Sequence, residues 1–383
     1  MKFVPNARRA GSPGVLALPA LLSMACMMLF VAAGPRPATA QVEDLLLENF
    51  RPQSIYHVPA TDVQQARFPV IDMHSHAYAG SQAELEQWVR NMDAVGIERT
   101  IILTGAVGER LDSLYRAYAQ FGDRFEVWCG LDLRGYDEPG FGPAAVAELE
   151  RCVALGGRGV GELSDKGRGL VSGGITAHGL HPDDPRMDPI FRKAAELGII
   201  INLHVADPMW MYMPMDSTND GLMTSYRWRL DDQPDIVDHA GMMQILDRTL
   251  ARHPETTFNV VHYANLTYDL AQLDDLLTRH PNLNVDVSAR YAEISQIPRA
   301  AKQFIEKHAD RVLYGTDLGF DDDMYRTTFR ILQTEDEHFY AHDIFRQHWA
   351  LRGLGLSDDT LRKVYRDNAL RLLNARDEKL GAR

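Results

Sequence analysis

The pattern of hydrophobic and polar positions divides the chain, from residue 68 onward, into alternating strand-like and helix-like segments. Short apolar runs rich in Val, Ile and Leu recur, and amphipathic stretches separate them. Eight runs are predicted to be strands: 68–76, 99–104, 125–133, 159–163, 199–206, 257–264, 283–288 and 311–317. Helices are predicted between them at 82–95, 109–121, 143–155, 188–197, 240–252, 268–279 and 297–309, and further helices follow the last strand.

Eight successive βα units predict an α/β fold with a parallel sheet, and their number favours a closed (β/α)8 TIM barrel over residues 68–383. A doubly wound open sheet is the alternative. Its nucleotide-binding form needs a glycine-rich turn after the first strand, and this chain has none there. Residues 41–67 show no clear period and are expected to form an N-terminal arm.

The segment 207–238, after the fifth predicted strand, is too long for a plain βα loop. It is rich in methionine and aromatic residues, among them Trp210. Such a composition is typical of a lid over a binding site or of a contact between identical subunits. We therefore expect a lid-like insertion here, and a homo-oligomer remains an open alternative.

The first forty residues have the pattern of a secretory signal peptide. Lys2, Arg8 and Arg9 form a basic start, residues 14–33 carry no charge, and Ala38 and Ala40 form a small-x-small cleavage pattern. This predicts a periplasmic or secreted protein. Because the apolar run is long for a signal peptide, an uncleaved membrane anchor is the alternative, and membrane contact is expected only in that case.

The net charge of the chain narrows the choice of binding partners. The formal net charge is −13, which does not favour binding to nucleic acid and leaves a small-molecule substrate as the expected partner.

Only Cys129 and Cys152 lie beyond the predicted signal peptide. A disulfide between them is open, but two buried thiols are the expected arrangement, because two cysteines do not make a disulfide framework.

Polar residues that bind metals occur near the carboxyl ends of five predicted strands, where the active sites of parallel barrels lie. They are His74, His76, Glu162, His204, His262 and Asp317. Side chains alternate along a strand, so His74 and His76 are expected on one face. The same rule places His262 on the face of Val260 and Glu162 on the face of Val160.

Imidazole and carboxylate ligands predict a divalent first-row metal, with zinc favoured and manganese as the alternative. Such an ion activates water, and Asp317 is suited to be a ligand, a general base or both. His262 could be a ligand of a second ion or could polarise the substrate. Arg227, Arg290, Trp210 and His181 are candidates for contact with the substrate, and an arginine would fit a carboxylate.

Six segments of this chain resemble the amidohydrolase superfamily, in particular the amidohydrolase-related group that includes aminocarboxymuconate-semialdehyde decarboxylase. They are Ile71–His76, Asp183–Phe191, Ile199–His204, Asn259–His262, Leu313–Asp317 and Asp367–Leu373. The resemblance implies a distorted barrel, a metal held by His74, His76, His204 and Asp317, and His262 at the catalytic centre. Glu162 matches the position of a bridging carboxylate in binuclear branches of the superfamily, so one tightly held ion is expected and a second ion is the alternative.

Three functions follow from these observations. The leading hypothesis is an exported metal-dependent hydrolase that uses metal-activated water to attack a carbonyl of an amide, ester or lactone. The alternative with the same ligands is a non-oxidative decarboxylase of an aromatic or unsaturated carboxylic acid. The third is a barrel that binds a ligand without catalysis. The sequence does not identify the substrate, because the loops of a barrel select it.

Overall fold

The computed structural model describes residues 44–381. The predicted signal peptide and its cleavage motif lie outside the described residues. From Leu46 onward the described residues form one compact unit, which contains the barrel. Within residues 44–381, no helix combines the length and the apolar character that crossing a membrane requires.

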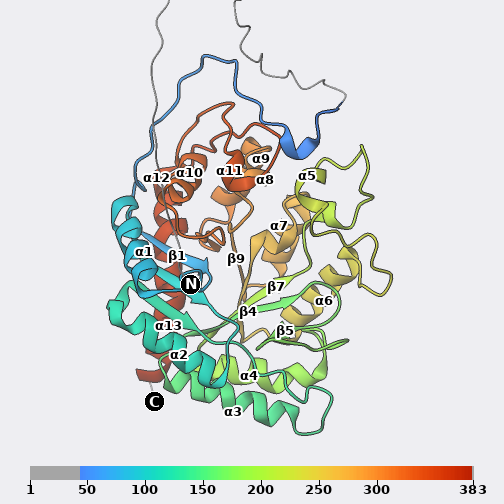
Figure 1. The fold of residues 1–383 in the computed structure, drawn as a ribbon. Helices are drawn as coiled ribbons and strands as arrows, with labels where there is room; N and C mark the ends of the chain where they lie inside the picture. Colours follow the sequence, from blue (N-terminus) through green and yellow to red (C-terminus); the bar gives the residue numbers. More distant parts are fainter. Residues whose placement is uncertain (1–43, 382–383) are drawn as a thin grey trace, which may run out of the picture. The chain divides into compact units, whose positions relative to one another are not determined.

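The eight predicted strands are all present and run parallel (Figure 1). One sheet has the order β1-β2-β3, and the parallel part of the other has the order β10-β9-β8-β7-β4. The strands are β1 (Val70–Ser75), β2 (Ile97–Leu103), β3 (Phe125–Trp128), β4 (Gly159–Asp165), β7 (Ile200–Val205), β8 (Thr257–Val260), β9 (Leu283–Asp286) and β10 (Val312–Leu313).

Backbone hydrogen bonds join the two sheets at both seams. Between β3 and β4, the amide of Cys129 donates to Gly159 O at 3.3 Å and the amide of Gly161 donates to Cys129 O at 2.8 Å. Between β1 and β10, the amide of Met73 donates to Tyr314 O at 3.0 Å. The strands therefore form a ring, and the predicted (β/α)8 barrel is confirmed.

The helices lie around the outside of the strands and match the predicted positions closely (Figure 1). The first shows why: Ser81 caps its N-terminus, Gly96 ends it in a left-handed conformation, and its apolar residues recur at helical spacing. The longer helices are α1 (Gln82–Val95), α2 (Gly108–Tyr118), α3 (Phe141–Ala154), α4 (Asp188–Leu197), α6 (His239–Arg252), α7 (Leu270–Arg279), α9 (Pro298–Lys307), α10 (Asp322–Gln333) and α13 (Asn368–Gly381).

Short elements fill the segments without a clear period. A hairpin of β5 (Val171–Ser172) and β6 (Ile175–Thr176) extends β4 in antiparallel fashion, and the sequence pattern did not predict it. The insertion 207–238 contains η5 (Met209–Met211) and α5 (Leu222–Ser225), and the arm contains η2 (Leu47–Asn49). Four short helices also follow later strands: α8 (Tyr291–Ile294), α11 (His342–Phe345), α12 (Asp358–Arg362) and the π-helix η7 (Lys363–Asp367).

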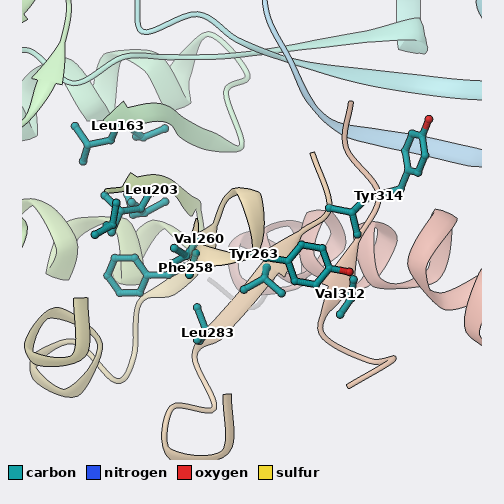
Figure 2. Close-up of a cluster of buried hydrophobic side chains, with 14 of the residues drawn as sticks. Leu163, Leu203, Phe258, Val260, Tyr263, Leu283, Val312 and Tyr314 are labelled. Atoms are coloured by element: carbon teal, nitrogen blue, oxygen red, sulfur yellow. The ribbon is translucent and has the colours of Figure 1, made fainter. Parts of the chain in front are cut away.

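Two hydrophobic clusters hold the barrel together. The larger one packs strands against helices, and Figure 2 shows its contributions from β4 to β10, including Leu163, Leu203 and Phe258. The smaller one joins Ile71, Ile200 and other strand residues to Leu372 of α13. Full burial of such side chains contributes roughly 1.5–3 kcal/mol each, so both faces of the strands are stabilised mainly by apolar packing.

Cys129 and Cys152 form a disulfide, so the expectation of two buried thiols was wrong. Cys129 lies just after β3 and Cys152 lies in α3, with 6.2 Å between their Cα atoms. Both residues are buried, and that distance is within the usual range for a disulfide. The bond links a strand end to the helix that follows it.

Removal of this disulfide is expected to lower the free energy of unfolding by about 3 kcal/mol, because the bond closes a short loop in the unfolded chain. The test compares urea unfolding of the wild type and the double variant Cys129→Ser/Cys152→Ser, each with and without dithiothreitol. The reductant should destabilise only the wild type. Two titratable thiols in the non-reduced, denatured wild type, after removal of the predicted signal peptide, would contradict the disulfide.

Candidate metal centre

The six candidate ligands lie at or just beyond the carboxyl ends of their strands. His74 is in β1 and His76 follows it, Glu162 is in β4, and His204 is in β7. His262 and Asp317 follow β8 and β10. The structure thus brings together, at one end of the barrel, side chains that are far apart in the sequence. His74 and Asp317 are separated by 243 positions (317 − 74).

The simple alternation rule was wrong for two of these ligands. Val260 and Val160 lie in the large cluster between strands and helices, whereas His262 and Glu162 face the barrel centre. A positive φ of 58° at His262 turns the chain after β8, and the register of β4 on β7 shifts between Val160 and Leu163. Irregular backbone at the strand ends therefore directs these ligands inward.

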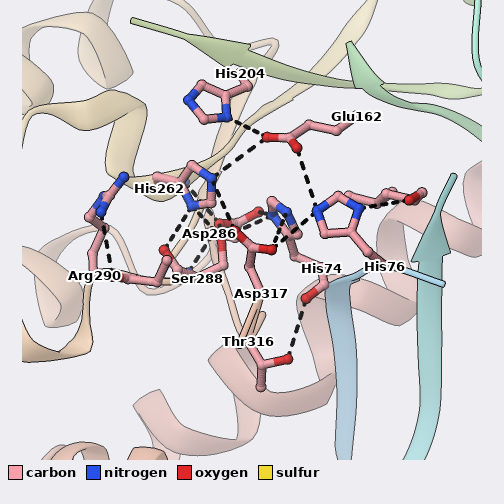
Figure 3. A network of polar contacts seen from close by, with 12 residues as sticks. His74, His76, Glu162, His204, His262, Asp286, Ser288, Arg290, Thr316 and Asp317 are labelled. Carbon is pink, nitrogen blue, oxygen red and sulfur yellow. Dashed lines mark hydrogen bonds and ion pairs between the residues drawn. The ribbon is translucent and has the colours of Figure 1, made fainter. Parts of the chain in front are cut away.

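Two carboxylates lie between the imidazoles (Figure 3). His76 Nε2 is 3.1 Å from Asp317 Oδ1 and 3.5 Å from Glu162 Oε2. His262 Nε2 is 3.6 Å from an oxygen of each carboxylate, and His204 Nδ1 is 2.5 Å from Glu162 Oε1. Glu162 and Asp317 therefore link all the histidines except His74, whose Nε2 lies 4.0 Å from Asp317 Oδ1.

Three groups of side chains could each hold an ion, with ligand atoms within 4.8 Å of one another. The groups overlap, because His74, Glu162 and His262 each belong to two of them. They are His74–His262–Asp317, His74–His76–Glu162 and Glu162–His204–His262. This geometry is compatible with one ion or with two neighbouring ions.

The outer nitrogens of the imidazoles are fixed by hydrogen bonds. His76 Nδ1 lies 2.8 Å from Leu103 O and His262 Nδ1 lies 2.9 Å from Ser288 O. A carbonyl oxygen only accepts, so each Nδ1 carries the proton and each Nε2 presents a lone pair to the centre. His204 is reversed: its Nε2 contacts Asp207 at 3.3 Å and its Nδ1 faces inward.

His74 gives the clearest test of whether a metal fits. Its side chain is fully buried, and its Nδ1 contacts Asp286 Oδ2 at 3.2 Å and Ser288 Oγ at 2.9 Å. Its Nε2 is buried and has no hydrogen-bond partner. A buried nitrogen without a partner costs free energy, and a cation among these ligands would satisfy it. The nitrogen and oxygen donor set suits a divalent first-row metal.

The charges also favour a cation. Burial alone would raise the pKa of Glu162, but the charge of His204 and the hydrogen bond from its imidazole hold this pKa well below its ordinary value. Burial likewise opposes ionisation of Asp317, and His74 and His76 bring its pKa below the ordinary value. Burial lowers the pKa of His262 to about 4, which keeps that imidazole neutral and able to bind a metal.

Sequence reasoning missed the residues that support the ligands. The carboxylate of Asp286 accepts from His262 N at 3.0 Å, Ser288 N at 3.1 Å and Asn259 Nδ2 at 2.9 Å, besides its contact with His74. The sequence does contain a pattern that could have indicated them: polar residues occupy every second position of an otherwise apolar strand, at Asn284, Asp286 and Ser288. Such buried acceptors orient metal ligands.

Asp72 joins the first strand to the segment after the last one. Its Oδ1 accepts from Thr316 N at 3.0 Å and from His74 N at 3.1 Å, and its Oδ2 accepts from Thr316 Oγ1 at 2.6 Å. The amides of Thr316 and Asp317 donate to His74 O at 3.1 and 2.9 Å. A side chain at Gly315 would collide there, because its Cβ would lie 2.7 Å from that of His74.

The four predicted substrate contacts lie at different distances from the ligands. Arg290 lies beside His262 (Figure 3), and Asn265 and Glu293 accept from its guanidinium at 2.9 and 3.1 Å. His181 contacts Asp165 at 2.6 Å, and Trp210 packs against Trp349.

Arg227 is in the exposed insertion, 3.9 Å from Glu48. Hydrogen bonds, ion pairs and ring contacts of the described residues place His181, Trp210 and Arg227 against neighbours other than the six ligands.

Comparison with known proteins gives a family and a fold. A model of the amidohydrolase family matches residues 57–375. The chain resembles 2,6-dihydroxybenzoate decarboxylase from Rhizobium, with 21% identity, a TM-score of 0.50, and coverage of 80% of this chain and 99% of that chain. A candidate amidohydrolase from Staphylococcus aureus is similar at 17% identity and a TM-score of 0.53, with coverage of 80% and 100%. No protein of curated function matches the sequence.

The support from Asp286 can be tested through metal affinity. Asp286→Asn should weaken zinc binding roughly 10- to 100-fold, because an amide cannot accept from all the donors that the carboxylate satisfies. Competition with a chromophoric chelator measures the affinity. Asp310→Asn, at a side chain that is 76% exposed, is the matched control and should bind zinc as the wild type does. Equal zinc affinity in both variants would show that Asp286 does not support the metal centre.

Proposed function

The chain belongs to the amidohydrolase family, and from this premise we propose that it is an exported metal-dependent hydrolase acting on a carbonyl of an amide, ester or lactone. The observation that carries the proposal is the convergence of four imidazoles and two ionised carboxylates, with His74 Nε2 buried and without a partner. When bound, a divalent cation lowers the pKa of a water molecule and polarises a carbonyl group.

Asp317 is the group best placed to move a proton. Its side chain is 22% exposed, the hydroxyl of Tyr78 donates to its Oδ1 at 2.9 Å, and its Oδ2 faces His262 Nε2. It accepts the proton of the attacking water and returns it to the leaving group. His262 serves as a ligand and not as a hydrogen-bond donor to the substrate, because its proton is on the Nδ1 that faces Ser288 O.

Export is part of the proposal, and two features support it. Residues 1–40 have the pattern of a signal peptide, and Cys129 is paired with Cys152 in a disulfide. Disulfides persist in oxidising compartments such as the periplasm and are rare in the cytoplasm. The periplasm or the cell exterior is therefore the proposed location.

A second candidate, non-oxidative decarboxylation, is favoured by Arg290. Its side chain is only 12% exposed beside His262, and its Nε is buried without a hydrogen-bond partner. A guanidinium in this position suits the carboxylate of an acid substrate. One protein of similar fold is 2,6-dihydroxybenzoate decarboxylase, so such a reaction is compatible with this barrel.

The metal centre is tested by His204→Ala and Asp317→Asn. Both variants should lose at least about 1,000-fold in kcat/KM, because each removes a group on which water activation depends, while circular dichroism stays unchanged. Elemental analysis of the wild type should give at least about one zinc or manganese per chain. A metal-free enzyme with full activity would refute the proposal.

Product analysis separates the two reactions. A panel of esters, lactones and amides is assayed for acid release, and a panel of aromatic acids is assayed for carbon dioxide. Acid release that His204→Ala abolishes supports the hydrolase. Carbon dioxide release that Arg290→Gln abolishes supports the decarboxylase instead. Full metal loading with neither product would favour a barrel that only binds a ligand.

Tyr78 is expected to hold Asp317 in its working orientation. Tyr78→Phe removes one hydrogen bond to the carboxylate and should lower kcat about 5- to 10-fold with little change in KM. Steady-state kinetics on the substrate found above measure the effect. Tyr56→Phe, at an exposed tyrosine of the arm, is the control. A rise in KM alone, with kcat unchanged, would place Tyr78 at the substrate and not at Asp317.

A further inference from the structure

A basic cavity of about 750 Å³ lies next to the metal centre, between the end of β4, the β5–β6 hairpin and the insertion. Its charged lining residues are Lys166, Arg168, Asp207, Arg227, Arg229 and Asp232. We propose that this cavity binds a carboxylate substituent of the substrate while the metal centre attacks a carbonyl elsewhere in the same molecule. The inference rests on the proposed function and specifies its substrate class.

Two residues that line the cavity are close to ligands of the metal centre. Ser164 lines the cavity and lies two residues after Glu162 on β4, and both side chains are partly exposed on the same strand end. Asp207 also lines the cavity, and its Oδ1 is 3.3 Å from His204 Nε2. The cavity therefore lies beside the outer nitrogen of His204, one side chain away from the metal centre.

The charge of the lining is positive in an acidic protein. Four basic side chains face two acidic ones, although the whole chain has a net charge of −13. Asp207 pairs with Lys166 at 3.0 Å and Asp231 pairs with Arg229 at 2.8 Å. Among the described residues, the two other basic groups of the lining have no carboxylate closer than 3.9 Å.

These two groups are Arg168 and Arg227. Arg168 donates to the neutral amide oxygen of Gln233 at 2.6 Å, and Arg227 is 3.9 Å from Glu48. Arg168 thus has only a neutral partner and Arg227 only a distant carboxylate, so their positive charge attracts an anion to the cavity. A guanidinium presents two parallel N–H donors, which match a carboxylate.

The loop that carries Lys166 and Arg168 is held in place by buried groups. Asp165 is fully buried, and its Oδ1 accepts from Gly167 N at 2.9 Å and from Gly169 N at 3.1 Å. Its Oδ2 lies 2.6 Å from Nδ1 of His181. Both glycines have positive φ and pack against backbone, so the loop has little freedom to move. His181 thus acts through Asp165, as a positioning residue.

Apolar surface next to the basic groups further defines the ligand. Trp228, Val171 and Ile236 line the same cavity, and Trp228 is 63% exposed. An aromatic or aliphatic acid would pack its apolar part against these side chains and direct its carboxylate to the arginines. A neutral compound of the same shape would lack the second interaction.

Benzoate and its neutral analogue benzamide are the probes, titrated into the full mature chain as purified and followed by calorimetry. Benzoate should bind the double variant Arg168→Gln/Arg227→Gln at least about fivefold more weakly than the wild type. The affinity for benzamide should be the same in both proteins. Arg192→Gln, at an arginine of α4 that is 64% exposed, is the matched control and should leave benzoate affinity unchanged. Equal benzoate affinity in the wild type and the double variant would overturn the inference.

The variant His204→Ala separates this inference from the proposed function. If benzoate binds His204→Ala as it binds the wild type, the cavity binds the carboxylate independently of the metal centre, and the inference stands even if no hydrolysis is ever observed. If His204→Ala abolishes benzoate binding and the double variant does not, the probe binds at the metal centre and the inference fails.

Discussion

The carboxylate of Asp72 is the contact on which the geometry of the barrel mouth depends. It receives hydrogen bonds from both the first strand and the segment after the last strand, and so it closes the ring where two ligand-bearing segments meet. His74 and Asp317 are on either side of this seam, where Thr316 contacts His74 and Asp72 across 242 and 244 residues of sequence. Because the carboxylate is fully buried, its bonds do not compete with water and fix both ligands firmly.

The metal centre is surrounded by a second layer of buried acceptors. Asp286 orients His74 and His262, and Asp207 contacts the outer nitrogen of His204. Burial would raise the pKa of Asp286, but the charge of His74 and its hydrogen bonds lower it to about 2, so this carboxylate stays charged. Buried charges of this kind are costly unless paired, and the imidazoles and backbone amides supply the pairing. Buried polar residues of the barrel thus form the site, and buried apolar residues stabilise the fold.

Most of the fold and the first layer of the site could be predicted from the sequence, because apolar strands ending in His or Asp are a local pattern. The roles of Asp72 and Asp286 could not be predicted, because they depend on hydrogen-bond donors from strands that are distant in the sequence. The Cys129–Cys152 pairing was also missed, because it depends on how α3 packs beside β3. The faces of Glu162 and His262 were misjudged, because irregular backbone at strand ends overrides simple alternation.

Gly315 illustrates how little room the mouth of the barrel leaves. The space that a methyl group would need is filled by the side chain of His74 and by Ser288, which itself supports His262. A larger residue would therefore act as a wedge that separates three neighbouring strand ends at once. We therefore expect substitutions to be tolerated in the loops around the mouth of the barrel, and not at Gly315 beneath them.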